Sequence, residues 1–262
     1  MKIHPSAIVH PDAQLADDVE VQAFSIIGEH VRIGSGTVVG PHCVIDGRTT
    51  LGEGNRLYSG AQIGVRSQDL KQRDDLLGRA QIGDNNIFRE HCSVSASTTA
   101  SEEDDHRVTS IGNGCLLMSS SHVAHDCHVG NSVILANCSM LAGHVTIQDN
   151  ATLSGLIAVH QDCVVGMLSF VGGMTRVSKD VPPYMIVEGN PARCHGPNSV
   201  GLQRNGFDEA ARKRIKELYR IMYRSKLNTT QALQEIEKSV EDCEERNRFL
   251  DFARKSVRGI LK

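Results

Sequence analysis

The chain has 262 residues, a formal net charge of −3, 40% hydrophobic residues and only 4% aromatic residues. This charge argues against general nucleic-acid binding, and no apolar run approaches the roughly 20 residues of a membrane span. We therefore expect a cytoplasmic protein with no nucleic-acid partner and no stable membrane insertion. Because Trp is absent, the core should be narrow and built from aliphatic side chains and Cys.

A six-residue repeat of aliphatic residues defines the first predicted domain, residues 1–190. With two interruptions, the repeat places Ile, Leu or Val at every sixth position from Ile3 to Val177, and Phe88 is its one exception. Neither the period of a helix nor that of a strand gives this spacing. A parallel β-helix does, because each short strand occupies one side of a prism and three hexads make an 18-residue coil.

Two interruptions of the repeat, at residues 64–81 and 95–110, are predicted to be loops that project from the prism. Inserted loops of a solenoid often carry function. The first contains SQDLK (67–71), and the second contains SEEDDH (101–106), which we interpret as an acidic, solvated loop.

Small residues occupy a second inward position, four residues after each aliphatic one. Five of the eight cysteines fall there: Cys43, Cys92, Cys115, Cys127 and Cys163. We interpret them as buried core residues rather than as metal ligands or nucleophiles.

The stretch SHVAHDCHVG at residues 121–130 contains three histidines, which suggests a metal site at first sight. The repeat, however, puts His122 and His128 at the same place on adjacent sides of the prism, and His125 lies between them. The three imidazoles therefore should not converge on one metal ion.

Residues 18 apart should stack on one line of the prism, which predicts a polar patch. Asp126 lies under His144, and His125 lies under Gly143. The predicted patch consists of His125, Asp126, His144, His160 and Gln161, with His122 beside it. We favour a functional site over decoration of a regular surface, because a positioned His can take a proton from a hydroxyl and the Gly143 N–H can stabilise an oxyanion. These groups suit acyl transfer.

Residues 191–262 have a different composition and are predicted to form a small helical domain. Helical spacing is expected over 206–225, 229–245 and 246–257. From Arg204 to Lys226, basic residues outnumber acidic ones by eight to three. This excess is either a binding patch or a solvated helix face.

Motifs along the whole chain resemble the UDP-N-acetylglucosamine O-acyltransferase family of lipid A synthesis, which has the hexapeptide-repeat, left-handed β-helix fold. The matching segments are IDG (45–47), SQDLK (67–71), HVAHDC (122–127), LAGH (141–144), AVHQ (158–161), DVPPY (180–184), EGNPA (188–192), GLQR (201–204) and SVRGI (256–260). The resemblance implies an all-β left-handed parallel β-helix followed by the helical domain.

The resemblance also implies an activity and roles for particular residues. A homotrimer would move a 3-hydroxyacyl chain from acyl carrier protein to the sugar 3-position of UDP-N-acetylglucosamine, with no cofactor and no metal. His125 would be the general base, Asp126 its supporting carboxylate and Gly143 the oxyanion donor. The substrate-binding residues would be Asp69, Lys71, His122, His144, His160, Gln161, Gly173, Asn198 and Arg204, with Gly173 at the position that limits acyl length.

Three segments depart from the family pattern and bear on substrate contacts. Ser95–Thr98 reads SAST where HRGT is common, Asp162 replaces a Phe, and Asn205 replaces an Arg. A diverged acyltransferase with another acceptor is therefore one alternative. The others are a metalloenzyme similar to γ-class carbonic anhydrases, with His91 as the best further ligand, and a non-enzymatic scaffold.

Overall fold

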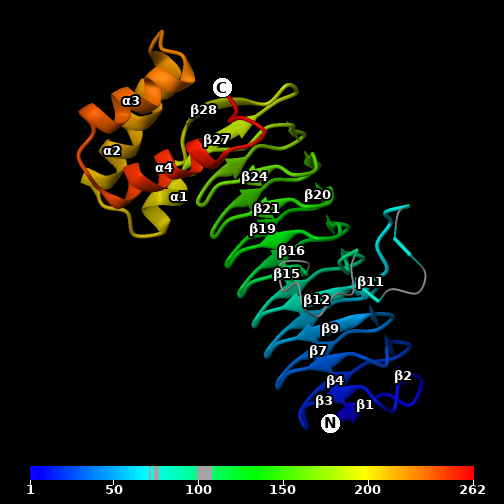
Figure 1. Cartoon of the computed structure of the whole chain (residues 1–262). Helices are drawn as coiled ribbons and strands as arrows, with labels where there is room; N and C mark the ends of the chain where they lie inside the picture. Colours follow the sequence, from blue (N-terminus) through cyan, green and yellow to red (C-terminus); the bar gives the residue numbers. More distant parts are fainter. Residues whose placement is uncertain (71, 74–76, 99–107) are drawn as a thin grey trace.

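The computed structural model describes residues 1–70, 72–73, 77–98 and 108–262. Within these ranges the chain forms a left-handed parallel β-helix, a three-sided prism with helices at its C-terminal end (Figure 1). Strands of successive coils pair in parallel, so that His122 lies beside Met140 and Met140 beside Ala158. This 18-residue register confirms the coil length that the repeat predicts.

The described strands form three sheets, one for each side of the prism. Sheet A contains β1 (Lys2–Ile3), β4 (Glu20–Val21), β7 (Val38–Val39), β10 (Arg56–Leu57), β13 (Ile87–Phe88), β16 (Leu116–Leu117), β19 (Ile134–Leu135), β22 (Thr152–Leu153), β25 (Phe170–Val171), β27 (Met185–Glu188) and β28 (Arg193–Pro197). Sheet B contains β2 (Ile8–Val9), β5 (Ile26–Ile27), β8 (Val44–Ile45), β11 (Gln62–Val65), β14 (Ser93–Ser95), β17 (His122–Val123), β20 (Met140–Leu141), β23 (Ala158–Val159) and β26 (Arg176–Val177). Sheet C contains β3 (Gln14–Leu15), β6 (Arg32–Ile33), β9 (Arg48–Leu51), β12 (Arg79–Ile82), β15 (Thr109–Ile111), β18 (His128–Val129), β21 (Thr146–Ile147) and β24 (Val164–Val165).

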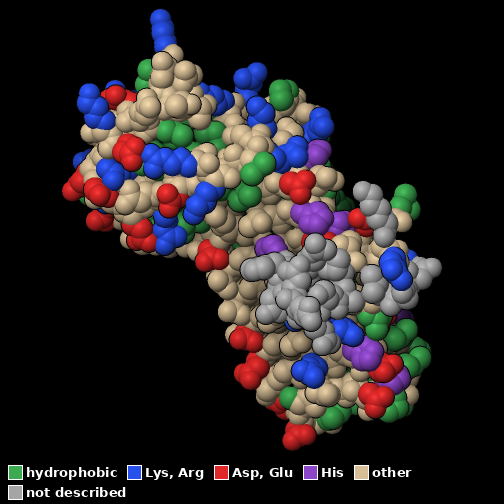
Figure 2. Space-filling model, viewed as in Figure 1, with side chains coloured by type: hydrophobic (Ala, Val, Ile, Leu, Met, Phe, Trp, Pro, Cys, Tyr) green, Lys and Arg blue, Asp and Glu red, His purple; other side chains and the backbone are tan. Residues whose placement is uncertain are grey.

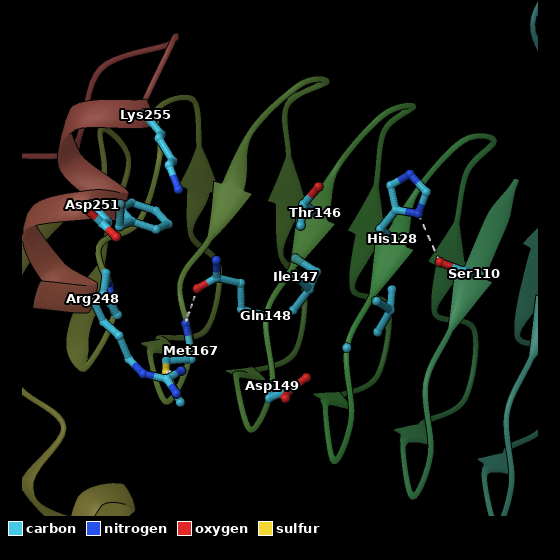
Figure 3. A pocket seen from close by; sticks show the side chains of 14 residues that line it. Ser110, His128, Thr146, Ile147, Gln148, Asp149, Met167, Arg248, Asp251 and Lys255 are labelled. Atoms are coloured by element: carbon cyan, nitrogen blue, oxygen red, sulfur yellow. Dashed lines mark hydrogen bonds between the residues drawn. The ribbon is translucent and has the colours of Figure 1, made fainter. Parts of the chain in front are cut away.

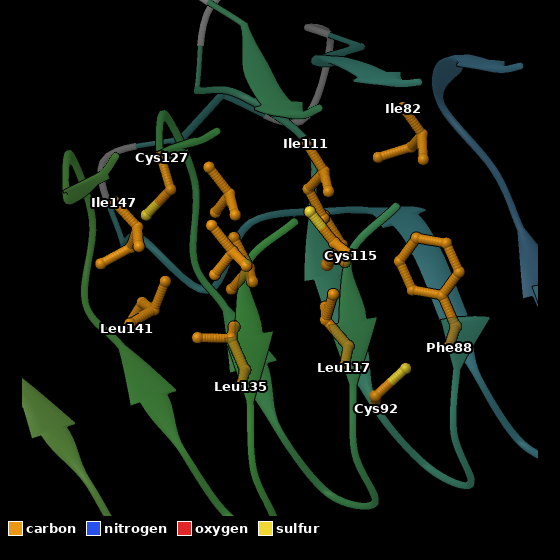
Figure 4. Close-up of a cluster of buried hydrophobic side chains, with 14 of the residues drawn as sticks. Ile82, Phe88, Cys92, Ile111, Cys115, Leu117, Cys127, Leu135, Leu141 and Ile147 are labelled. Atoms are coloured by element: carbon orange, nitrogen blue, oxygen red, sulfur yellow. The ribbon is translucent and has the colours of Figure 1, made fainter. Parts of the chain in front are cut away.

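The interior of the prism is aliphatic, with thiols between the aliphatic layers. The repeat positions are buried from Val21 to Val177, whereas Ile3 is exposed because no further coil covers that end. The five inward cysteines are buried, as predicted, and Figure 4 shows three of them among Ile, Leu and Phe side chains.

The corners of the prism repeat one backbone conformation. Asp126, His144 and Asp162 follow one another on the edge between sheets B and C, with φ values of 57°, 61° and 61°. The left-handed region costs about 1–2 kcal/mol for most L-residues, and Asp and Asn tolerate it best. The stacked corner positions confirm the line of residues on which the predicted patch depends.

The C-terminal residues form α1 (Ser199–Arg204), α2 (Glu209–Tyr219), the π-helical turn η1 (Arg220–Arg224), α3 (Thr229–Ser239) and α4 (Glu244–Lys255). Asp208 and Asn228 accept hydrogen bonds from the first turns of α2 and α3, which fixes where these helices begin.

The sequence prediction was wrong about the boundary between the last two helices, and it missed α1. Val240 and Cys243 have extended backbones, and Arg246 donates to the Val240 carbonyl across this connection. Glu244 and Glu245 then begin α4, where carboxylates favour the positive end of the helix dipole.

The helical segment and the end of the prism share contacts. Leu168 and Tyr184 pack into the same buried cluster as the helices, and Leu261 returns to the prism core. The division into two domains at residue 190 stays a prediction. In the part of the chain that the structure describes, each helix is too short or too polar to cross a membrane.

Candidate active site

His125 and Asp126 form a hydrogen-bonded pair on the edge between sheets B and C. The His125 Nδ1 lies 2.8 Å from the Asp126 Oδ2, and the two side chains are 15% and 7% exposed. An ionised carboxylate only accepts hydrogen bonds, so this contact places the proton of a neutral imidazole on Nδ1. The lone pair of Nε2 is then available on the opposite side of the ring.

The Asp126 carboxylate is held from the preceding coil. Thr98 donates to it from its hydroxyl at 2.8 Å and from its backbone N–H at 3.3 Å, while the Asp126 N–H donates to the Thr109 hydroxyl at 2.8 Å. Burial alone would raise the pKa of Asp126, but the hydrogen bonds from His125 and Thr98 outweigh it and hold the pKa below its ordinary value. The carboxylate is therefore ionised near neutral pH.

Gly143 lies directly against the His125 ring. A Cβ atom at residue 143 would lie 2.4 Å from the His125 Cε1, which leaves room only for glycine. Within the described residues, the Gly143 N–H makes no backbone hydrogen bond, whereas its carbonyl accepts from the Asp162 N–H at 3.3 Å. This amide is available to a ligand beside the imidazole.

Two further histidines flank the pair. The His122 Nδ1 contacts the Ser93 hydroxyl at 2.8 Å, and burial, with a smaller effect of nearby His125, lowers the pKa of His122. This ring is therefore neutral near pH 7. The His144 ring is 52% exposed and meets His125 edge-on, with 5.1 Å between ring centroids.

His160 and Gln161 lie one coil beyond His144 and are exposed. The Gln161 side chain donates to Asp162, at 3.3 Å, so one of the departures from the family pattern contacts a predicted site residue. The stacking of coils brings the residues of the predicted patch together on the edge between sheets B and C. Figure 2 shows histidine side chains gathered near mid-height of the prism.

A cavity of about 390 Å³ opens over the hydrogen-bonded pair of His125 and Asp126. Its lining residues come from the loop after β11, from four strands of sheet B and from the corner: Gln68, Asp69, Ser95, His122, Ala124, His125, Met140, Leu141, Ala142, Ala158 and Val159. The Asp69 Oδ2 lies 3.9 Å from the His125 Nε2, so the inserted loop reaches the site as expected. Lys71, its predicted companion, lies outside the described residues.

Three predicted substrate-binding residues lie elsewhere in the single chain. Gly173 is on the edge between sheets A and B, with space around it, and Arg204 is exposed at the end of α1. Asn198 is buried, caps α1 through Gly201 and donates to the Leu168 carbonyl. None of the three reaches His125 within one chain.

The site also contains a possible metal-binding group. Donor atoms of His125, Asp126 and His144 lie within 4.8 Å of one another, which suits a small cation in number and type. This is not the set that the sequence alternative expects, since His91 packs against Gly60 on the edge between sheets A and B. The 2.8 Å contact between His125 and Asp126 is also that of a hydrogen bond, so a metal would have to displace its proton.

A larger cavity, of about 590 Å³, lies between sheet C and α4 (Figure 3). His128 borders it and contacts Ser110 at 2.9 Å, so His128 does point to another side of the prism, as predicted. Arg248 on its far wall pairs with Glu244 and contacts the Met167 sulfur. Between residues that the structure describes, the hydrogen-bonded His–carboxylate pair is the one at the smaller cavity, so we take the smaller cavity as the candidate site.

Sequence reasoning missed the larger cavity, because its two walls, sheet C and α4, are far apart in the sequence. It also missed the roles of Ser93 and Thr98. Thr98 belongs to the Ser95–Thr98 segment that departs from the family pattern, and no periodic signal connects it to Asp126.

Two family models match parts of this chain. A family model described as UDP N-acetylglucosamine O-acyltransferase, domain 2, matches residues 180–261, and one described as bacterial transferase hexapeptide (six repeats) matches residues 109–143.

Full-length relatives carry the same description. The chain is 46% identical over 263 residues to the acyl-[acyl-carrier-protein]–UDP-N-acetylglucosamine O-acyltransferase of Syntrophobacter fumaroxidans and 44% identical over 262 residues to that of an Anaeromyxobacter species, with 100% of both chains covered in each case. The solved UDP-N-acetylglucosamine acyltransferase of Francisella novicida matches with a TM-score of 0.93 and 36% identity, covering 99% of this chain and 93% of that one.

The three-sided prism, its six-residue repeat and these matches define a hexapeptide-repeat acyltransferase. Full-length identity above 40% narrows this class further. The chain belongs to the UDP-N-acetylglucosamine O-acyltransferase family.

Proposed function

We propose that this protein transfers a 3-hydroxyacyl chain from acyl carrier protein to the 3-hydroxyl of UDP-N-acetylglucosamine, the first step of lipid A biosynthesis. One observation carries the proposal: the His125–Asp126 pair leaves Nε2 free toward the 390 Å³ cavity, beside the unpaired Gly143 amide. Family membership supplies the substrate classes. Both are water-soluble cytoplasmic compounds, so we place the reaction in the cytoplasm.

The base step follows from the hydrogen bond between the two side chains. The His125 Nε2 accepts the proton of the sugar hydroxyl as its oxygen attacks the thioester carbonyl, and Asp126 stabilises the resulting imidazolium. The oxyanion of the tetrahedral intermediate accepts a hydrogen bond from the Gly143 N–H. Collapse breaks the C–S bond, and the thiolate takes the proton back from His125, which yields the ester and the free thiol.

Asp69 faces the His125 Nε2 across the site, with its Oδ2 3.9 Å from that nitrogen. Because both atoms accept hydrogen bonds, the acceptor hydroxyl donates to Nε2, and a second hydroxyl of the sugar donates to Asp69. We assign sugar-nucleotide contacts to Asp69 and Lys71. The neutral His122 lines the cavity, and His144, His160 and Gln161 extend the same polar edge toward the thioester.

The remaining residues enter the proposal through a homotrimer. Because Asn198, Arg204 and Gly173 lie apart from His125 in one chain, we propose that a neighbouring copy brings Asn198 and Arg204 to the uridine and phosphates. Gly173, with open space beside it, would admit a long acyl chain.

Acyl carrier protein, an acidic partner, would dock on the basic helices. Between Arg204 and Lys226, Lys213, Arg214 and Arg220 pair with carboxylates. The other cations of this segment have no carboxylate partner among the described residues: Arg204, Arg212, Lys216, Arg224 and Lys226. Figure 2 shows Lys and Arg side chains on this end of the molecule, interspersed with Asp and Glu. An unpaired cluster of this kind suits an acidic protein surface.

A product assay tests the proposal. The purified protein is incubated with UDP-N-acetylglucosamine, or its 3-amino analogue, and carrier thioesters of several 3-hydroxyacyl lengths, and acylated nucleotide is measured by mass spectrometry. We expect one acceptor and a narrow range of acyl lengths to give product. Absence of product with every pair contradicts the proposal.

A metal-dependent reaction is the second candidate, because the donor atoms of His125, Asp126 and His144 converge. It predicts stoichiometric metal in the purified protein and loss of activity on chelation. The acyltransferase proposal predicts that acyl transfer continues at an unchanged rate in EDTA.

A further inference from the structure

The Asp126 carboxylate is nearly buried and depends on few donors. Its side chain is 7% exposed, and a buried carboxylate is costly unless hydrogen bonds satisfy it. Its Oδ2 atom takes two short hydrogen bonds, one from His125 and one from the Thr98 hydroxyl, each 2.8 Å long. The Thr98 hydroxyl is therefore the one short side-chain donor to this carboxylate, among the described residues, besides the catalytic imidazole.

Thr98 comes from a different coil. It follows β14, which pairs in parallel with β17, so that Ser93 lies beside His122 and Val94 beside Val123. The chain then extends past the strand end, and Thr98 reaches the next corner across 28 residues of sequence. Thr98 does not line the cavity over His125. It contacts the carboxylate but not the space for substrate.

We propose that Thr98 is a positioning residue, whose hydroxyl orients the Asp126 carboxylate so that Oδ2 accepts the His125 Nδ1–H. This inference rests on the proposed function of His125 as the base. Without the hydroxyl, the carboxylate turns away from the imidazole, toward water or toward His144, whose Nε2 lies 3.9 Å from the same oxygen. The imidazole then also populates the tautomer with its proton on Nε2, which cannot accept a proton from the sugar.

Thr109 acts differently, although it also contacts Asp126. Its hydroxyl accepts from the Asp126 backbone N–H and so holds the corner itself, in the left-handed conformation at φ 57°. Removing the Thr98 hydroxyl leaves this backbone contact in place. The effect of a Thr98 variant should therefore be confined to the carboxylate.

Kinetics of three variants test the assignment. Thr98→Val keeps the shape of the side chain and removes the donor, and Thr98→Ser keeps the donor. We expect Thr98→Val to lower kcat about tenfold, as for loss of a hydrogen bond to a charged group, with KM for UDP-N-acetylglucosamine within about twofold of wild type. Thr98→Ser should restore most of the rate. Thr152→Val on sheet A is the matched control and should leave the rate unchanged.

A double variant separates positioning from a general loss of structure. If Thr98 acts through the carboxylate, Thr98→Val should have no further effect in an Asp126→Asn background. A further tenfold loss in that background overturns the assignment. So does a Thr98→Val variant in which KM rises while kcat is unchanged.

A measurement that needs no turnover distinguishes failure of this inference from failure of the proposed function. In ¹⁵N-His-labelled protein, the nitrogen shifts of His125 report its tautomer. We expect the Nδ1–H form in wild type and in Thr98→Ser, and a mixture of tautomers in Thr98→Val. An unchanged tautomer in Thr98→Val overturns the positioning role, even if the enzyme proves to use other substrates.

Discussion

Two edges of the prism share one backbone conformation and differ in the side chains at several of their corners. On the edge between sheets A and B, Phe24, Leu156 and Met174 have φ values of 60°, 61° and 58°. Asp126 and His144 have φ values of 57° and 61° on the edge between sheets B and C. The first edge exposes apolar side chains, whereas the second holds a hydrogen-bonded network.

The comparison shows that the repeat determines the backbone conformation of an edge. The side chains at its corners determine which contacts the edge can make. Phe24, Leu156 and Met174 are 60%, 61% and 76% exposed. In the proposed homotrimer, we expect a second copy of the chain to cover this edge. The polar edge instead directs its groups into a cavity.

The largest expected effect is at the polar edge. His125→Ala removes the proposed base and should lower kcat by about 10²–10⁴-fold in the carrier-thioester assay. The matched control is His91→Asn at a corner of the apolar edge, where Asn tolerates the positive φ of 56°. Equal losses in the two variants would contradict the contrast between the edges.

Substitution of one glycine on each edge by alanine compares how much space the two edges leave for a side chain. Gly143 precedes His144, and Gly155 precedes Leu156 at the corresponding place on the apolar edge. An added Cβ would lie 2.4 Å from the His125 ring at residue 143, but no closer than 3.3 Å to any neighbour at residue 155. Gly143→Ala should lower kcat by about 10²-fold, through a displaced base and oxyanion donor, while Gly155→Ala keeps its activity. A fully active Gly143→Ala excludes this arrangement.

The oligomeric state tests whether the apolar edge is an interface between copies of the chain. Leu156→Glu places a charge on the proposed interface and should shift the mass measured by light scattering from three chains toward one, with activity falling accordingly. Val257→Glu, in the exposed C-terminal tail, is the control and should keep the wild-type mass. If Leu156→Glu leaves the mass unchanged, this edge is not an interface.

The smallest expected effect is on the free energy of unfolding and on its dependence on pH. Because the folded state holds the pKa of Asp126 below its ordinary value, this carboxylate stabilises the fold above about pH 4 and ceases to do so as pH falls through the lowered pKa. Asp126→Asn should lower the free energy of unfolding by about 1–3 kcal/mol at pH 7, and the difference should shrink below pH 4.

The control for this measurement is Asp162→Asn, two coils along the same edge, where the side chain is exposed. We expect this variant to unfold like wild type in urea at both pH values. A pH-independent loss in Asp126→Asn would mean that its carboxylate charge does not contribute.

The sequence predicts the stacking of site residues only in the part of the chain where every coil has the same length. From Ile111 onward each coil advances by 18 residues, so simple addition placed Gly143 over His125 and His144 after Asp126. Before that point the insertions change the spacing. The contact between Thr98 and Asp126 crosses one of them, and periodicity carries no information there.

The helical end was predicted only in outline. Amphipathic spacing located α2, but α1 has six residues and only Leu202 buried, too short a pattern to recognise. Asn198 shows a second limit, because a residue assigned to substrate by resemblance also caps α1 and bonds to Leu168. Such contacts depend on tertiary packing that no local pattern encodes.

The thiols inside the prism have a consequence for chemoselectivity. Cys127 is adjacent in sequence to Asp126, yet burial raises the pKa of its thiol to about 12, and its Sγ contacts the Ala142 carbonyl. A thiolate beside a thioester would capture the acyl group and poison the protein by self-acylation. Turned inward and kept protonated, Cys127 leaves the acyl group to the acceptor hydroxyl, so this thiol does not compete with it at the proposed base.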